Sequence, residues 1–194
     1  GLGNDFVIID KRIKNIKITK DLINKLSDRK SGAGCDQLIT INSSKESDIH
    51  AQIEIFNPSG DRAEACGNGT RCVAKLLFNE LKVNQIQILS DAGILSAKKI
   101  DSDNISINLG KLSTNWEEIP LANEMDSLNI PININGLSNG VAVNIGNPHC
   151  IFFVKNIKDI DLYNIGPSIE NHKLFPNKTN VEIIEIVNKR KIKM

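Results

Sequence analysis

The sequence predicts an α+β fold whose sheets are largely antiparallel. Runs that are typical of strands outnumber the helical patterns, and the clearest helical pattern follows several strands instead of alternating with single strands. The 194 residues suffice for one large domain or two small ones, and either could bury a hydrophobic core. We therefore expect a helix packed on a curved sheet.

The first half of the chain predicts several strands and two helices. Phe6–Asp10 is a short apolar run typical of a buried strand, and Thr19 is placed to cap a helix that ends near Arg29. Residues 57–60, Asn-Pro-Ser-Gly, have the proline and glycine spacing of a turn, and a second helix covers roughly residues 69–80. Further strands are expected at Gln37–Ile41, His50–Phe56, Gln85–Ser90, Ile94–Ile100 and Ile105–Leu109.

The strand pattern fades between Gly110 and Leu137, where a tryptophan and two prolines indicate irregular chain. We place a domain boundary there, which divides the chain into residues 1–112 and 113–194. Downstream of it we expect a helix near Asp159–Asn171 and strands at Val141–Ile145, Ile151–Val154 and Val181–Val187.

Charge and hydropathy indicate no macromolecular or membrane partner. The net charge is +1, from 24 basic and 23 acidic residues, so no global field attracts nucleic acid or anionic lipid. No apolar stretch approaches the length of a membrane span, and no signal-peptide pattern opens the sequence. We therefore expect a cytoplasmic protein that acts on a small molecule.

The four cysteines are expected to be free thiols that bind no metal. A core of this size needs no disulfides, no two cysteines have Cys-x-x-Cys spacing, and no histidine pairs with them. We expect Cys35, beside Asp36 in a glycine-rich turn, to be structural, and Cys72, inside the second helix, to be a core thiol. Strand alternation points Cys150 away from its neighbour His149, which favours His149 as the functional residue of that pair.

Cys66 differs from the others because it lies on a glycine-rich turn just before a helical pattern. The free amides of a helix N-terminus favour negative charge, so they can stabilise a thiolate and bind an anion beside it. Gly67 and Gly69 let the backbone approach a ligand closely. Such a thiol can act as a base or a nucleophile, although a buried structural thiol before a helix is the alternative interpretation of Cys66 alone.

Five short motifs together resemble the successive signatures of the diaminopimelate epimerase family, in the family's order and at about its spacings. They are Gly1-Leu-Gly-Asn-Asp-Phe6, Ser31-Gly-Ala-Gly-Cys-Asp-Gln37, Phe56-Asn-Pro-Ser-Gly60, Ala65-Cys-Gly-Asn-Gly69 and Asn144-Ile-Gly-Asn-Pro-His149. The turn at residues 57–60 reads Asn-Pro-Ser-Gly where the family usually has Asn-Ala-Asp-Gly, so Asn57 and Gly60 are kept and the two middle residues differ.

The resemblance implies a fold and an activity. The family has two similar domains, each a sheet wrapped around a central helix, with the active site in the cleft between them. Its members are isomerases that interconvert LL- and meso-diaminopimelate with two cysteines and no cofactor, in lysine and peptidoglycan precursor biosynthesis. A homodimer is left open.

The resemblance also assigns roles to particular residues. Cys66 would be one of the two thiols that remove and return the α-proton, and the Gly67 and Asn68 amides would bind the substrate's α-carboxylate. His149 would tune the acidity of the catalytic thiols, whereas His50 and His172 are expected to be structural. Five amide side chains, each of which taken singly could be a turn residue, would bind the zwitterionic substrate: Asn4, Gln37, Asn57, Asn147 and Asn180.

We expect this chain to be a fragment with an incomplete second domain. It begins at Gly1 inside a motif and ends at Lys191–Met194 in what resembles an unfinished strand. The family's second cysteine lies in an Ala-Cys-Gly-Thr-Gly segment that this sequence lacks, so we expect no turnover from these residues alone.

Other functions stay open on the sequence alone. One is a different two-cysteine racemase, such as a proline racemase, or the related isomerase without the cysteine pair. A second is an amino-acid-binding module that keeps half of the site without catalysis. A third is a redox-active pair formed by Cys66 and Cys72, for which the helical spacing is poor.

Overall fold

The computed structural model describes residues 3–194, so Gly1 and Leu2 of the opening motif lie outside the described residues. The chain forms two compact units that divide between Gly110 and Lys111. We placed the boundary after residue 112, and the assignment of the units to the family's two domains stays a prediction. Each unit is described by itself below.

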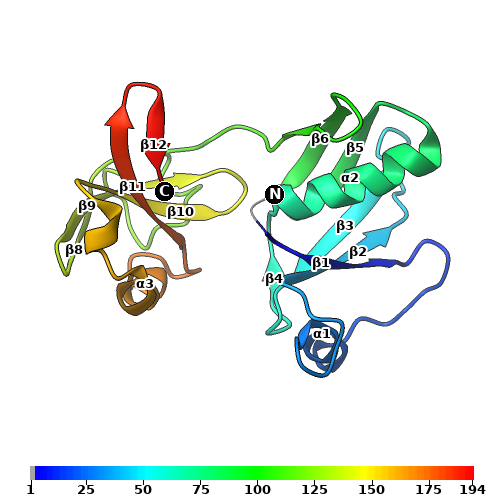
Figure 1. Cartoon of the computed structure of the whole chain (residues 1–194), viewed down its shortest axis with the longest axis horizontal. Coiled ribbons are helices and arrows are strands. Elements are labelled where there is room, and N and C mark those ends of the chain that lie inside the picture. The colour runs from blue at the N-terminus through cyan, green and yellow to red at the C-terminus, as the bar shows by residue number, and fades with distance from the viewer. Residues whose placement is uncertain (1–2) are drawn as a thin grey trace. The chain divides into compact units, whose positions relative to one another are not determined.

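The first unit contains a mixed sheet with strand order β1-β2-β3-β5-β6-β7, in which β4 pairs with β3 (Figure 1). Strands β1 and β2, and strands β3 and β5, are parallel, and the other pairs are antiparallel. The strands are β1 (Phe6–Asp10), β2 (Gln37–Asn42), β3 (Ala51–Phe56), β4 (Arg62–Ala63), β5 (Gln85–Ser90), β6 (Gly93–Lys99) and β7 (Ile105–Asn108).

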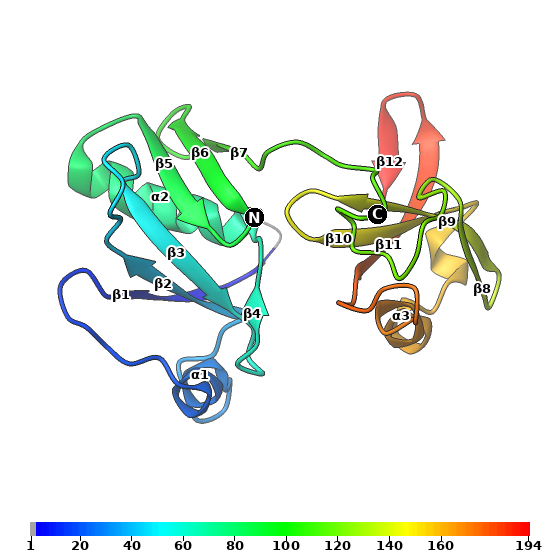
Figure 2. The same cartoon turned by 180° about the vertical axis from the view of Figure 1, so that it is seen from behind.

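Two helices accompany this sheet. Helix α1 (Lys20–Ser27) begins after Thr19, whose hydroxyl accepts the Leu22 N–H at 3.2 Å, so the predicted cap is confirmed. The helix ends two residues earlier than predicted. Helix α2 (Gly67–Leu81) lies across one face of the sheet. In Figure 2, which views the molecule from the opposite side to Figure 1, the strands lie in front of this helix.

Helix α2 is held by an apolar stripe that faces the sheet. Val73, Ala74, Leu77 and Phe78 recur at helical spacing, are buried, and pack with the inward-facing side chains of β2, β3 and β5. Burial of such a stripe is the main favourable contribution to the stability of a helix in a globular protein. The helix is thereby fixed on the sheet, and the position of its N-terminus is fixed with it.

The second unit contains a sheet with strand order β12-β11-β10-β9-β8, in which β10 and β11 are parallel and the other pairs antiparallel. Ile165 and Ile169 of α3 pack into its core with Phe152 and Ile183. The elements are β8 (Ile130–Ile134), β9 (Leu137–Asn144), β10 (Pro148–Val154), a single 3₁₀ turn (Ile157–Asp159), α3 (Leu162–Glu170), β11 (Asn180–Asn188) and β12 (Lys191–Lys193).

The α+β fold class is confirmed, and one stretch of the prediction is wrong. The region 110–137 is not irregular throughout, because its last part forms β8 and the start of β9. Ile130 and Ile132 alternate inward, while Pro131 points outward on an edge strand. Proline is tolerated at a sheet edge because the donor that it lacks is not needed there. No helix among the described residues is long and apolar enough to cross a bilayer.

Candidate active site

Cys66 is the N-cap residue of α2. Its backbone is extended, its Sγ accepts the Gly69 N–H at 3.4 Å, and its carbonyl accepts the Thr70 N–H at 2.9 Å. Helix geometry leaves the N–H groups of Gly67 and Asn68, the first two helical residues, without an intrahelical acceptor. The thiol therefore lies beside two backbone donors at the positive end of the helix dipole, where an anion is favoured.

Gly69 allows the first turn of α2 to approach the sheet. A Cβ at this position would lie 2.4 Å from Cδ1 of Ile39 and 3.3 Å from Cε1 of Phe6. Ile39 is fully buried in the core of the first unit, so its side chain has no free space into which to move. At Gly67 a Cβ would meet only Leu109, at an ordinary 3.4 Å.

We predict that Gly69→Ala lowers the free energy of unfolding of the first unit by about 1–3 kcal/mol, because the added methyl overpacks the contact with Ile39. Gly67→Ala is the matched control and is expected to change it by less than about 1 kcal/mol, since alanine is also the better helix former. Urea denaturation followed through amide signals of the first unit measures both. Equal effects of the two substitutions would contradict the packing explanation.

Asn4 and Asn68, both predicted as substrate ligands, contact each other. The Asn68 Nδ2 donates to Asn4 Oδ1 at 2.7 Å, and the Asn4 Nδ2 donates to Asp36 Oδ2 at 3.0 Å. Arg71, one turn further along α2, donates to the other side of the Asn68 amide. The start of β1 and the start of α2 are thus joined by side-chain hydrogen bonds.

Asp36 belongs to a charged cluster that the sequence analysis missed. The Arg29 guanidinium donates to both oxygens of Asp5 at 2.8 Å and to Asp36 Oδ1 at 2.7 Å. The hydrogen bonds from Arg29 lower the pKa of Asp5 to about 2, and the hydrogen bond from Asn4 is the main cause of the lowered pKa of Asp36. Both carboxylates are therefore ionised near neutral pH, and Asp36 holds Asn4 by accepting from its amide.

Gln37 and Asn57 form a second pair of predicted ligands. Gln37 begins β2, and Asn57 follows the end of the antiparallel strand β3, where the register pairs Leu38 with Phe56. The Gln37 Nε2 donates to Asn57 Oδ1 at 3.0 Å. The predicted turn is also present, since the Gly60 N–H donates to the Asn57 carbonyl at 2.8 Å and Gly60 has a φ of +87°.

The predicted residues of the first unit meet at one end of its sheet. Strands β1 and β2 begin there, the antiparallel strand β3 ends there, and the Asn4–Asn68 bond ties the N-terminus of α2 to the same end. Amide side chains, the backbone N–H groups at the start of α2 and the Cys66 thiol therefore lie toward the same end of the sheet. Such a set can bind a carboxylate and an ammonium group and can move a proton.

The second unit brings together its three predicted residues, Asn147, His149 and Asn180. The His149 Nε2 lies 2.9 Å from Asn147 Oδ1, and the parallel register pairs His149 with Asn180. The Asn180 Nδ2 donates to the Pro148 carbonyl at 3.0 Å. The other ring nitrogen of His149 lies 2.7 Å from Oε1 of Glu182, a residue that we did not predict.

The other cysteines and histidines differ from the candidates. Cys35 and Cys150 are buried, and burial, with a smaller contribution from the nearby Glu182 charge, raises the pKa of the Cys150 thiol to about 12. His50 and His172 each accept a backbone N–H through Nδ1, at 3.2 and 3.3 Å, as expected of structural histidines.

The prediction that Cys72 is a core thiol is wrong, because its side chain is exposed. The buried stripe of α2 begins at Gly69 and Thr70 and continues at Val73 and Ala74. Cys72 falls just outside it, since an α-helix turns once in about 3.6 residues. Apolar composition around Cys72 did not reveal which face of the helix it occupies.

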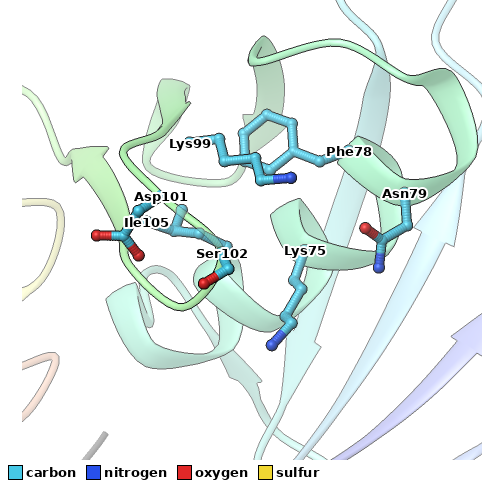
Figure 3. Close-up of a pocket in the computed structure, with 7 residues that line it drawn as sticks. All are labelled: Lys75, Phe78, Asn79, Lys99, Asp101, Ser102 and Ile105. Atoms are coloured by element: carbon cyan, nitrogen blue, oxygen red, sulfur yellow. The ribbon is translucent and has the colours of Figure 1, made fainter.

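A separate pocket lies further along α2 (Figure 3). It is lined by side chains of α2 and of the β6–β7 region, namely Lys75, Phe78, Asn79, Lys99, Asp101, Ser102 and Ile105. None of these described residues is a predicted site residue. Within residues 3–194 no cluster of three or more His, Cys, Asp or Glu side chains could hold a metal ion.

The sequence matches proteins of one known family over most of its length. A family model described as diaminopimelate epimerase matches residues 1–114 and 141–194. The chain is 47% identical over 199 residues to the diaminopimelate epimerase of Pelagibacter ubique, covering 100% of this chain and 72% of that protein. It is 42% identical over 187 residues to that of a Wolbachia of Drosophila simulans, covering 96% of this chain and 69% of that protein.

Solved structures show the same fold at low identity. A "probable proline racemase" from Agrobacterium radiobacter K84 superposes with a TM-score of 0.61 at 14% identity, covering 89% of this chain and 56% of that chain. This likeness concerns the fold alone. The family match and the curated relatives, by contrast, extend over most of the sequence, and they show that the chain belongs to the diaminopimelate epimerase family, a family of isomerases.

Proposed function

We propose that the protein interconverts LL- and meso-diaminopimelate by removing the α-proton from one face of the carbon and returning a proton to the other. The observation that carries the proposal is the position of Cys66, whose Sγ accepts the Gly69 N–H at 3.4 Å at the start of α2. A thiol suits this task because it is uncharged when protonated and can act as a base when it is not.

The backbone around Cys66 supports the same chemistry. When the thiolate takes the α-proton, the carbanion delocalises into the α-carboxylate, which gains enolate character. The N–H groups of Gly67 and Asn68 would donate to that carboxylate and stabilise the charge as it develops. Donors fixed at a helix N-terminus need no reorganisation during the reaction.

The amide side chains would select a zwitterionic amino acid. Asn4 and Asn68 join at one place, and Gln37 and Asn57 at another, so each pair offers both donor and acceptor atoms. Neutral amides can bind an ammonium group and a carboxylate of the same substrate without a preference for one sign of charge. Asn147 and Asn180 of the second unit would act in the same way.

No other thiol of this chain is proposed as the opposing acid. Cys35 and Cys150 are buried in their cores, and Cys72 is exposed on the helix beyond its first turn. The protein is proposed to act in the cytoplasm, in the biosynthesis of lysine and of peptidoglycan precursor, and to need no cofactor. Its assembly as a homodimer stays open and is tested by analytical ultracentrifugation of the full-length protein.

The test is deuterium incorporation in heavy water. The full-length protein, dialysed exhaustively, is incubated with LL-diaminopimelate, and we expect deuterium at the α-carbon together with formation of the meso isomer. L-Proline, offered in parallel, is expected to remain unlabelled.

The alternatives give different results in the same assay. Labelling of proline but not of diaminopimelate would point to a proline racemase. Calorimetric binding of diaminopimelate without any exchange would point to a binding module. Exchange that is lost on dialysis and restored by pyridoxal phosphate would contradict a mechanism based on thiols alone.

A further inference from the structure

We propose that Glu182 is a positioning residue that fixes the ring orientation and the proton arrangement of His149, so that His149 exchanges protons through Nε2. The inference rests on the proposed function in so far as it assumes that His149 acts in the site. His149 and Glu182 both belong to the second unit.

The sheet places the two side chains together. The parallel register of β10 and β11 pairs His149 with Asn180 and Ile151 with Glu182. Because side chains alternate along a strand, His149, Asn180 and Glu182 lie on one face of the sheet, while Cys150 packs into the core on the other. The Glu182 Oε1 lies 2.7 Å from His149 Nδ1, and both side chains are about one-fifth exposed, at 22% and 23%.

The contact determines which ring nitrogen keeps its proton. An ionised carboxylate can only accept a hydrogen bond, so His149 must donate from Nδ1. In the neutral ring the lone pair is then on Nε2, and in the imidazolium Nε2 carries the second proton. The Asn147 Oδ1 lies 2.9 Å from Nε2 and can accept a hydrogen bond from the protonated Nε2 of the imidazolium. If the amide rotates, its Nδ2 can instead donate to the lone pair of Nε2 in the neutral ring. Only Nε2 changes its protonation while the Glu182 contact is kept.

Among the described residues, His149 is the hydrogen-bond partner that the structure gives the Glu182 carboxylate. Its second oxygen, Oε2, is buried and accepts no hydrogen bond from any residue in 3–194. A glutamate that serves only the packing of a strand normally has both oxygens hydrated or paired. Burial is the main cause of the raised pKa of the Cys150 thiol on the neighbouring strand, and the nearby negative charge of Glu182 contributes to it. Among the described residues, the hydrogen bond and the ion pair that the structure gives Glu182 are both made with His149.

The variants are Glu182→Gln, which keeps the shape and removes the charge, and Glu182→Asp, which keeps the charge but draws it back by one methylene. Glu185→Gln is the matched control. It removes a carboxylate from the same strand whose partners are Lys193 and the Ile157 N–H, away from His149.

Two measurements on the full-length protein separate positioning from a structural role. The ¹⁵N chemical shifts of the His149 ring report which nitrogen is protonated, and kcat and KM report the reaction. We expect an Nδ1–H ring in the unmodified protein, a mixture of tautomers in Glu182→Gln, and a kcat lower by about 10–100-fold with little change in KM. Glu182→Asp should keep the Nδ1–H form and lose less activity, and Glu185→Gln should match the unmodified protein.

The outcomes distinguish this inference from the proposed function. An unaltered tautomer and unaltered kcat in a folded, active Glu182→Gln protein would overturn the positioning role and leave the epimerase intact. Loss of the Nδ1–H form in a protein that shows no epimerase activity even when unmodified would support the positioning role and contradict the proposed function. If Glu182→Gln fails to fold, a folded Glu182→Asp protein that keeps the Nδ1–H form and loses part of its activity would support the positioning role. A folded Glu182→Asp protein that loses the Nδ1–H form but keeps its full activity would overturn it.

Discussion

Replacement of Cys66 by serine is expected to lower the rate of α-proton exchange by about 10²–10⁴-fold, the usual contribution of a positioned acid or base. Serine keeps the size of the side chain and can still cap α2 by accepting the Gly69 N–H, so the fold should persist. A hydroxyl is a much weaker acid than a thiol and carries no useful negative charge at neutral pH. Deuterium exchange into diaminopimelate measures the loss.

Cys72→Ser is the matched control for this experiment. Cys72 lies on the same helix, but its side chain is exposed and outside the first turn, so the substitution should leave exchange unchanged. A large loss in Cys72→Ser with normal folding would revive the interpretation that Cys66 and Cys72 act as a pair. Near-normal exchange in Cys66→Ser would remove Cys66 from the proposed mechanism.

Leu77→Ala is expected to lower the free energy of unfolding of the first unit by about 2–5 kcal/mol, through lost apolar burial and the cavity that remains. Leu77 is fully buried between α2 and the sheet, in the core that holds the helix bearing Cys66. Because the chain has two compact units, urea unfolding should be followed through amide signals of the first unit.

The neighbouring residue provides the control. Leu76 is 48% exposed on the same helix, so Leu76→Ala removes the same atoms without opening a cavity in the core. Its effect should stay within about 0.5 kcal/mol. If the two substitutions destabilise the unit equally, the apolar stripe of α2 is not what holds the helix on the sheet.

Local patterns predicted most elements of the fold. Strands β1 and β5 have the predicted bounds, and α2 begins two residues before its predicted start, because Cys66 caps it and Gly67 and Asn68 already belong to its first turn. These features depend on neighbours within a few residues, which the sequence displays directly. The errors are two strands that were not predicted, β4 and β8, and the face of α2 on which Cys72 lies. In β8, Pro131 concealed an alternating strand.

The contacts among the candidate residues could not be predicted in the same way. Their residue types and their places at strand ends and turns were visible, and the family resemblance indicated roles that stay predictions. The pairing of Gln37 with Asn57 requires the register of β2 against β3, and that of Asn4 with Asn68 requires α2 to lie where its buried stripe places it.

By itself, the sequence determined the fold class, the family and the position of a thiol at the start of a helix, because each depends on short-range patterns or on motifs in order. Only the tertiary structure decided that the Arg29 guanidinium donates hydrogen bonds to both Asp5 and Asp36. The same holds for the contact between Glu182 and His149, which lie on two neighbouring parallel strands. Glu182 and His149 are 33 positions apart in the chain. Such contacts arise from strand register and core packing, which long-range burial sets and which no local pattern encodes.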